Sequence, residues 1–381
     1  MSTVDLADLR ITLLAGTLGQ GGAERQLFHV VCALKESGAE VRLLCLTQGE
    51  FWQARIEDLG VPVTWVGENP SRFARLRRII GELRAHRPAV IQSFHFYANF
   101  YASVAGRMCR IPDIGALRND GLSEMRAYGR LLGCAGLRWP RVLAANSRVG
   151  IRNATTLGAK AERLFHLPNV LDTGHFCPGP ARTNQSDSWN LVAVGRLHQQ
   201  KRFDRLIQVM AQLGRLPGRP VRLVIVGDGP LRSELEALAV HCGVADAVQF
   251  IGAVEDTVPF LQAADAAVLT SDFEGTPNVV MEALSCGLPV VTTGAGGVRE
   301  IMVDGETGTI VPLGPVEAEA DGVAETETVS QLAQALQTLR EDYEKRSLMG
   351  RQARAQAEDR FSRNRLPAVL SELYALALHL K

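Results

Sequence analysis

The chain has 381 residues, of which 46% are hydrophobic and 22% charged, an ordinary composition for a globular protein. This length exceeds one typical core and predicts two domains. No apolar run approaches the roughly 20 residues that span a membrane, and the first ten residues lack the basic segment of a signal peptide. Seven cysteines without a Cys-x-x-Cys pair are typical of reduced thiols, so we expect a cytoplasmic protein.

The formal net charge of zero hides an asymmetry between the two halves of the chain. Residues 1–175 hold 22 basic and 15 acidic residues, and residues 176–381 hold 19 and 26. A basic half suits an anionic membrane surface or a phosphorylated acceptor, whereas charge pairing between the halves explains the asymmetry equally well.

Short apolar runs alternate with helical patterns along the whole chain. The runs predicted to be strands are 11–15, 41–46, 63–66, 90–93, 114–117 and 142–145, then 191–194, 223–226, 248–251, 266–270, 290–293 and 309–311. Predicted helices include 23–37, 72–86 and a last helix at about 366–380. The alternation predicts parallel sheets covered on both faces, and therefore an α/β protein of two Rossmann-like domains with ligands at the carboxyl ends of the strands.

A Pro-, Gly- and polar-rich segment separates the two series of strands. We therefore predict an N-terminal domain at 1–174, a linker at 175–188, a C-terminal domain at 189–364 and a terminal helical segment at 365–381. Residues 313–328 are acidic and low in complexity, which predicts an exposed loop.

Two carboxylates, Glu274 and Glu282, flank a predicted helix start. Thr276 is predicted to cap this helix, Pro277 suits its first turn and Gly287 can end it. The free N–H groups and positive dipole end of a helix start favour phosphate. Carboxylates on both sides of a phosphate suit the hydroxyls of a sugar nucleotide.

In each predicted domain, a loop of interest follows the first strand. Arg196 and Lys201 follow residues 191–194, where a strand-loop-helix corner places two cations at a phosphate-binding edge, although surface cations at a turn are the alternative. Gly21 and Gly22 open the first helix of the chain, where glycine lets backbone N–H groups approach a ligand. The latter loop fits neither the NAD fingerprint nor the P-loop.

Other site classes lack support in the sequence. Asp272 and Glu274 form a short acidic pair without a second acidic cluster, and no His/Cys set has zinc spacing. No Gly-x-Ser-x-Gly elbow and no nucleic-acid motif occurs, so we expect no nucleic-acid partner. The arginine-rich segment 72–87 alternates with apolar residues and fits either a solvated core helix or a helix on an anionic membrane.

The stretch 273–291 resembles the donor site of the retaining GT-B glycosyltransferases of family 4, which carry a Glu-x7-Glu pair before a Cys-Gly-Leu-Pro-Val-Val-like run. The resemblance extends over residues 10 to about 370. It implies a GT-B fold, with two Rossmann-like domains facing a central cleft and a C-terminal helix that packs back on the first domain. It also implies a hexosyl- or N-acetylhexosaminyltransferase that uses a UDP- or GDP-sugar with retention of configuration.

The resemblance also implies roles for residues. Arg196 and Lys201 would neutralise the diphosphate and replace a metal, so no cofactor is expected. Glu282 would hold ribose hydroxyls, and Glu274 and His95 would contact the donor sugar. The remaining implied donor residues are Gly21, Gly22, Gly227, Val254, Gly275, Thr276, Pro277 and Asn278, and the acceptor-side residues are Arg118 and Asn119.

Two positions depart from the family pattern. The family often has His-x-His near position 95, and here the register is shifted by one residue at His95. The family usually has glycine after the lysine, and here Arg202 follows Lys201.

The acceptor implied by the basic first half is a glycan or lipid-linked glycan, reached in the cytoplasm or at the inner face of the cell membrane. Two alternatives remain open: a GT-B-fold sugar-nucleotide epimerase, and a non-catalytic partner subunit of a transferase.

Overall fold

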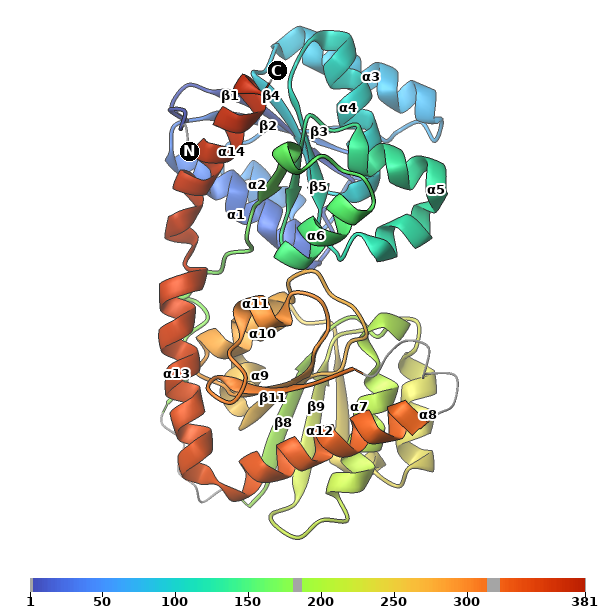
Figure 1. Cartoon of the computed structure of the whole chain (residues 1–381), viewed down its shortest axis with the longest axis vertical. Helices are drawn as coiled ribbons and strands as arrows, with labels where there is room; N and C mark the ends of the chain where they lie inside the picture. Colours follow the sequence, from blue (N-terminus) through green and yellow to red (C-terminus); the bar gives the residue numbers. More distant parts are fainter. Residues whose placement is uncertain (1–2, 181–186, 314–322, 381) are drawn as a thin grey trace. The chain divides into compact units, whose positions relative to one another are not determined.

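The computed structural model describes residues 3–180, 187–313 and 323–380, which form two compact units (Figure 1). Unit 1 comprises Met1–Val170 and Arg363–Lys381, and unit 2 comprises Leu171–Ser362. The chain therefore leaves unit 1 after Val170, before the predicted linker at 175–188, and returns to it after Ser362.

Unit 1 contains a seven-stranded parallel sheet in the order β3-β2-β1-β4-β5-β6-β7. Its strands are β1 (Arg10–Ala15), β2 (Glu40–Cys45), β3 (Val63–Trp65), β4 (Val90–Ser93), β5 (Asp113–Leu117), β6 (Val142–Ala145) and β7 (Leu164–His166). Its helices are α1 (Gly22–Glu36), α2 (Gln53–Glu57), α3 (Arg72–His86), α4 (Asn99–Cys109), α5 (Leu122–Arg138), α6 (Arg148–Thr156) and α14 (Leu366–His379).

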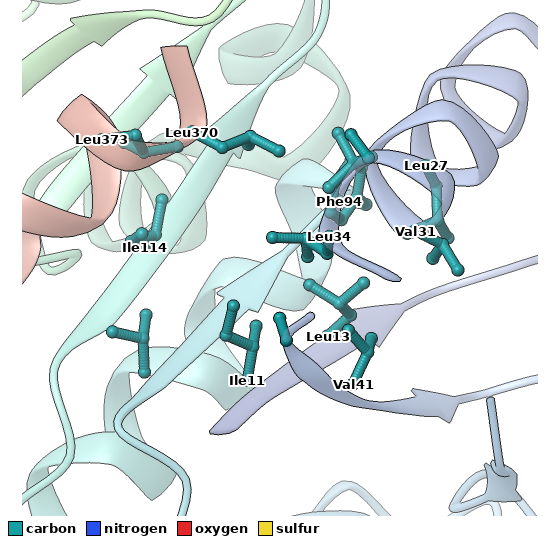
Figure 2. Close-up of a cluster of buried hydrophobic side chains, with 14 of the residues drawn as sticks. Ile11, Leu13, Leu27, Val31, Leu34, Val41, Phe94, Ile114, Leu370 and Leu373 are labelled. Carbon is teal, nitrogen blue, oxygen red and sulfur yellow. The ribbon is translucent and has the colours of Figure 1, made fainter. Parts of the chain in front are cut away.

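The core of unit 1 explains why the C-terminal helix belongs to this unit. Leu370 and Leu373 of α14 are fully buried in the same cluster as Leu13 of β1 and Leu27 of α1 (Figure 2). The buried Tyr374 hydroxyl of α14 also donates a hydrogen bond to Oε1 of Gln92 on β4, at 2.7 Å. The predicted return of the last helix to the first domain is therefore confirmed.

Unit 2 contains a six-stranded parallel sheet in the order β10-β9-β8-β11-β12-β13. Its strands are β8 (Trp189–Val194), β9 (Val221–Val226), β10 (Val248–Gly252), β11 (Ala266–Leu269), β12 (Val290–Thr293) and β13 (Gly308–Val311). Its helices are α7 (Phe203–Leu213), α8 (Arg232–His241), α9 (Val258–Ala263), α10 (Asn278–Ser285), α11 (Val298–Ile301), α12 (Val323–Glu341) and α13 (Tyr343–Phe361).

The strand order reverses between β1 and β4 in unit 1, and between β8 and β11 in unit 2. Open α/β sheets bind ligands at the carboxyl ends of the strands beside such a switch point. The loops after these four strands carry Gly21, His95, Arg196 and Glu274, respectively. Chain topology thus brings the predicted residues of each unit to the ligand-binding edge of its sheet.

The structure corrects three details of the sequence prediction. Strand β7 was not predicted. Residues 323–328 form the start of α12 instead of a loop, whereas 314–322 lie outside the described residues. Thr276 does not cap α10, because Pro277 occupies the N-cap position and no side chain caps that helix. In the described segments, every helix is too short or too polar to cross a membrane.

Candidate active site

Lys201 and Glu274 form an ion pair at the switch point of unit 2. Lys201 ends a short 3-10 turn after β8, and its Nζ lies 2.6 Å from Oε1 of Glu274 in the loop after β11. The Ser271 hydroxyl donates a hydrogen bond to the same Oε1 at 2.7 Å. Residue Glu274 is 7% exposed, and its carboxylate is held in one position by a cation and a hydroxyl.

The backbone around Glu274 is fixed by the loop that follows β12. The Thr293 hydroxyl donates to the carbonyl of Ser271 at 2.6 Å, and the Gly297 N–H donates to the carbonyl of Gly275 at 2.8 Å. Gly296 has a φ of +56°, and a Cβ on it would lie only 1.7 Å from the Glu274 carbonyl oxygen. Only glycine fits at position 296, because this approach is too close for any side chain.

Helix α10 places Glu282 behind its N-terminal turn. Since no side chain caps α10, its first N–H groups suit an anion. Glu282 is 3% exposed and accepts a hydrogen bond from the Thr257 hydroxyl at 3.5 Å. The helix ends as predicted before Gly287, whose φ is +70°. The N-terminus of α10, which suits a phosphate, therefore lies between Glu274 and Glu282 in the chain.

Arg202 adopts the left-handed conformation, with φ 51° and ψ 46°. This conformation explains why glycine suits position 202 in the family that the chain resembles, since other residues are strained there. In this chain the guanidinium of Arg202 pairs with Asp204 at 3.0 Å, Asp272 at 3.3 Å and Glu325 of α12 at 2.9 Å. Burial alone would lower the pKa of Arg202, but these carboxylates outweigh burial and hold the pKa above its usual value. The loop keeps the conformation typical of glycine because its arginine is held by three carboxylates.

The neighbouring Arg205 completes this network. Its side chain is 1% exposed and pairs with Asp272 at 2.9 Å and with Glu325 at 2.7 Å. Asp272, the first member of the acidic pair noted in the sequence, is therefore engaged by two arginines.

Arg196 remains exposed in the loop after β8. The backbone beside it is fixed, because the Leu197 N–H donates to the carbonyl of Asp228 at 3.0 Å. Gly227 follows β9 with a φ of +138°, and a Cβ there would lie 2.0 Å from the carbonyl oxygen of Gly195. Val254 lies half-buried in the loop after β10. These loops bring the predicted residues of β8, β9 and β10 to one edge of the sheet.

In unit 1, His95 is held by both of its ring nitrogens. Its Nδ1 accepts a hydrogen bond from the Gly16 N–H at 3.0 Å, and its Nε2 lies 3.1 Å from Oε1 of Glu24. An Nδ1 that accepts an N–H bond carries no proton, so Nε2 carries the proton and donates to Glu24. Glu24 was not singled out in the sequence, although it lies in the first turn of α1, two residues after Gly22.

The glycine-rich loop of unit 1 is organised by a second carboxylate, Glu50. Its Oε2 accepts hydrogen bonds from the hydroxyls of Thr17 and Thr47, at 2.8 and 2.6 Å, and from the N–H of Leu18. Burial raises the pKa of Glu50, but these donors outweigh burial and lower it below its usual range. The loop before Gly21 is therefore anchored by an ionised side chain.

Arg118 and Asn119 follow β5 in unit 1. The Arg118 guanidinium lies 5.0 Å from the centre of the Phe94 ring, and its buried Nε and Nη2 have no hydrogen-bond partner among the described residues. Burial lowers the pKa of Arg118 to about 10. The Asn119 N–H donates to Oε1 of Glu124 at 3.0 Å, and burial raises the pKa of Glu124 to about 7.

Both halves of the chain match known glycosyltransferase families. Residues 180–356 match the family Glycosyl transferases group 1, and residues 21–170 match the Glycosyl transferase 4-like domain. The lipopolysaccharide core biosynthesis glycosyltransferase LpsE of Rhizobium meliloti is 31% identical over 319 residues, which cover 80% of this chain and 84% of LpsE. A GDP-mannose-dependent alpha-(1-6)-phosphatidylinositol monomannoside mannosyltransferase of Mycolicibacterium smegmatis is 35% identical over 191 residues, 46% of this chain and 49% of that protein.

Solved structures share the fold. Anabaena HepE in complex with UDP-glucose superposes with a TM-score of 0.81 at 20% identity, over 96% of this chain and 99% of HepE. WaaG, a glycosyltransferase involved in lipopolysaccharide biosynthesis, gives a TM-score of 0.72 at 18% identity, over 96% of this chain and 99% of WaaG. The two-sheet architecture is therefore the GT-B fold, and the chain belongs to the group 1 glycosyltransferases.

Proposed function

We propose that this enzyme transfers a hexose or N-acetylhexosamine from a UDP- or GDP-sugar to a glycan or lipid-linked acceptor, with retention of configuration. The proposed pathway class is the synthesis of a cell-surface polysaccharide or glycolipid. The single observation that carries the proposal is the Lys201–Glu274 ion pair at the switch point of unit 2.

The ion pair supports a donor site for two reasons. A lysine tied to a carboxylate at 2.6 Å is positioned before the donor binds. A donor diphosphate carries more negative charge than one carboxylate, and therefore competes with Glu274 for Lys201. In our proposal the diphosphate takes over the ammonium group, and the released Glu274 carboxylate contacts the donor sugar.

Three further features complete the proposed donor site. The exposed Arg196 adds a second cation for the diphosphate. The start of α10, which no side chain caps, presents its positive dipole end to the phosphate, and Gly275, Thr276, Pro277 and Asn278 form the chain segment beside the phosphate and sugar. The buried Glu282 carboxylate accepts the ribose hydroxyls, while Gly227 and Val254 lie beside the nucleotide.

We propose a same-face transfer that needs no metal cofactor. The bond between the anomeric carbon and the phosphate oxygen breaks, and the diphosphate leaves with its electron pair, stabilised by Arg196 and Lys201. The acceptor oxygen forms its bond to the anomeric carbon on the same face, and its proton passes to the leaving phosphate oxygen. His95 already donates its only proton to Glu24, so we assign it to positioning of the loop around Gly21 and Gly22.

Unit 1 is the proposed acceptor unit. The two unpaired nitrogens of the Arg118 guanidinium suit an anionic group of the acceptor, and Asn119 adds an amide. The relatives point to the same acceptor class, because LpsE is named for lipopolysaccharide core biosynthesis and the mannosyltransferase for a phosphatidylinositol mannoside.

The proposal is tested by incubating the full chain with UDP- and GDP-sugars and with lipid-extracted core oligosaccharides. Products are analysed by NMR for anomeric configuration, with and without EDTA. We expect one donor to give an axial-to-axial or equatorial-to-equatorial transfer that persists in EDTA. An inverted product contradicts retention, an epimerised donor identifies an epimerase, and an intact donor with every acceptor identifies a non-catalytic subunit.

A further inference from the structure

The two loops that carry the proposed donor site, after β8 and after β11, are tied to each other along their backbones. The Gln200 side chain donates a hydrogen bond to the carbonyl of the residue before Glu274 at 2.7 Å, and the Asp272 N–H donates to the carbonyl of Gln200 at 3.0 Å. The Thr270 hydroxyl donates to the carbonyl of Lys201 at 3.0 Å. The position of Lys201 therefore depends on the position of the loop that presents Glu274.

The buried guanidinium of Arg205 on α7 holds the loop after β11. Its Nη1 donates a hydrogen bond to the carbonyl of Thr270 at 2.8 Å and lies 2.9 Å from Oδ1 of Asp272. The side chain is 1% exposed, and charge-assisted hydrogen bonds are strong in an interior of low dielectric constant. Arg205 therefore fixes this loop at two points shortly before Glu274.

Glu325, in the first turn of α12, holds Arg205 in turn. Its Oε1 and Oε2 accept hydrogen bonds from Nε and Nη2 of Arg205, both at 2.7 Å, which is the two-bond geometry favoured between arginine and carboxylate. Burial alone would raise the pKa of Glu325, but Arg205 and Arg202 outweigh burial and lower it, so the carboxylate is ionised. Helix α12 packs against α7 (Figure 1), and the contacts therefore run from α12 through α7 to the loop of Glu274.

The pair of Arg205 and Glu325, called the clamp below, gains importance when the donor binds. In the proposed function the diphosphate takes Lys201 away from Glu274, so this contact no longer holds the two loops. We propose that Arg205 and Glu325 are positioning residues, which keep the Glu274 carboxylate at the donor sugar while Lys201 binds the diphosphate. The inference deepens the proposed function and rests on it for the identity of the ligand. The clamp itself belongs to the protein without ligand.

The first experiment therefore uses the full chain without ligand. Amide hydrogen exchange, followed by peptide mass spectrometry, is compared over residues 196–204 and 270–276. The test variant is Glu325→Gln, which keeps the shape of the side chain and removes its charge. The matched control is Gln337→Ala, which removes a hydrogen bond of 2.9 Å between the same helix and the carbonyl of Pro217, about 18 Å further along α12.

We expect residues 270–276 to exchange at least threefold faster in Glu325→Gln than in the wild type, because the loop opens more often when the clamp is loosened. Exchange of the same segment should be unchanged in Gln337→Ala. Equal exchange in the wild type and Glu325→Gln overturns the clamp. Equal acceleration in both variants also overturns it, since weaker packing of α12 then accounts for the change.

The second experiment separates positioning from binding by initial rates at saturating donor and by calorimetry with the nucleoside diphosphate. A misplacement of a reacting group by about 1 Å costs on the order of 100-fold in rate. We expect kcat to fall at least tenfold in Glu325→Gln, with the Kd of the nucleoside diphosphate within threefold of wild type because Arg196 and Lys201 remain. Arg205→Lys, which keeps the charge and loses the two-bond geometry, should lie between Glu325→Gln and the wild type.

Two kinetic results would overturn the positioning role. One is a kcat of Glu325→Gln no lower than that of Gln337→Ala. The other is an equal loss of nucleotide affinity and of kcat, which would assign the clamp to the phosphate site instead of the sugar. A wild type that binds no nucleotide overturns the proposed function, and the exchange experiment then decides on the clamp by itself.

Discussion

The ammonium group of Lys201 lies 2.6 Å from Oε1 of Glu274, although the two residues are 73 positions apart in the chain. They meet because β8 and β11 are neighbours in the sheet, and the loops after both strands lie at its carboxyl edge. This contact connects the predicted diphosphate-binding loop with the predicted sugar-binding loop.

Glu274→Gln is expected to separate phosphate binding from sugar transfer. The substitution removes the carboxylate that competes for Lys201, so a nucleoside diphosphate without sugar should bind several-fold tighter. Transfer should fall about 100-fold or more, since a charged group at the reacting sugar is lost. Ser271→Ala, which removes the hydroxyl on the same oxygen without a change of charge, is the control, and calorimetry and initial rates measure both. Weaker binding of the diphosphate to Glu274→Gln contradicts the competition.

Gly296→Ala is expected to displace the backbone of Glu274. The added Cβ would lie 1.7 Å from the Glu274 carbonyl oxygen, so the loop must move. Misplacement of a reacting group by about 1 Å costs on the order of 100-fold in rate. The matched control is Gly305→Ala, which has a φ of +80° but no atom within 4 Å of the new Cβ. Steady-state rates should fall for position 296 and stay near wild type for position 305. Equal rates in the two variants contradict the steric argument.

Two substitutions of Arg202 are expected to separate backbone strain from ion pairing. Both Arg202→Ala and Arg202→Gly lose the contacts to Asp204, Asp272 and Glu325, but only glycine tolerates the left-handed backbone without strain. Arg202→Gly should therefore be about 1 kcal/mol more stable than Arg202→Ala, measured by denaturant unfolding. Alanine at least as stable as glycine would show that the loop relaxes out of this conformation.

The buried Glu124 is expected to make the stability of unit 1 fall as the pH rises. Burial raises the pKa of its carboxyl to about 7, above the 4.5 of the unfolded chain, so the folded state binds the extra proton between these values. The contribution of Glu124 to stability is present below pH 4.5 and is lost as the pH rises to 7, by about 3 kcal/mol at most. Glu124→Gln removes this titration. The free energy of unfolding is measured at pH 5 and at pH 8. Between these values the wild type should lose more stability than Glu124→Gln, and an equal loss in both proteins contradicts the shifted pKa.

Much of the fold follows from local sequence signals. Buried parallel strands are continuous apolar runs, which is why 11–15 and 290–293 were recognisable as strands. Strand β7 was missed because Leu164–His166 is short and only Phe165 in it is buried. The start of α12 was misassigned because its acidic composition resembles a loop, whereas Glu325 in it pairs with Arg202 and Arg205.

The candidate site was predictable where residue type and position in the chain suffice. Gly287 and the cations after β8 are visible in one sequence, whereas the need for glycine at 296 appears only from its close approach to the Glu274 carbonyl. Contacts across the sheet are not, because they depend on packing between distant segments: Ser271 beside Glu274 and Glu24 beside His95 carried no separate signal. The conformation of Arg202 was hidden because only tertiary ion pairs permit an arginine at a position that favours glycine.

The central claim, a nucleotide-sugar donor held by Arg196 and Lys201, is tested most directly by a thermal-shift panel with UDP, GDP, ADP and their sugar conjugates. The wild type is compared with Arg196→Ala/Lys201→Ala and with Arg215→Ala/Arg222→Ala, which removes two exposed cations from other parts of unit 2. At 100 times the Kd, a ligand stabilises its protein by about 2.7 kcal/mol. We expect a shift with the conjugates of one base, kept in the control and lost in the site variant. The absence of a shift with every nucleotide, or an equal shift in all three proteins, would contradict the donor site.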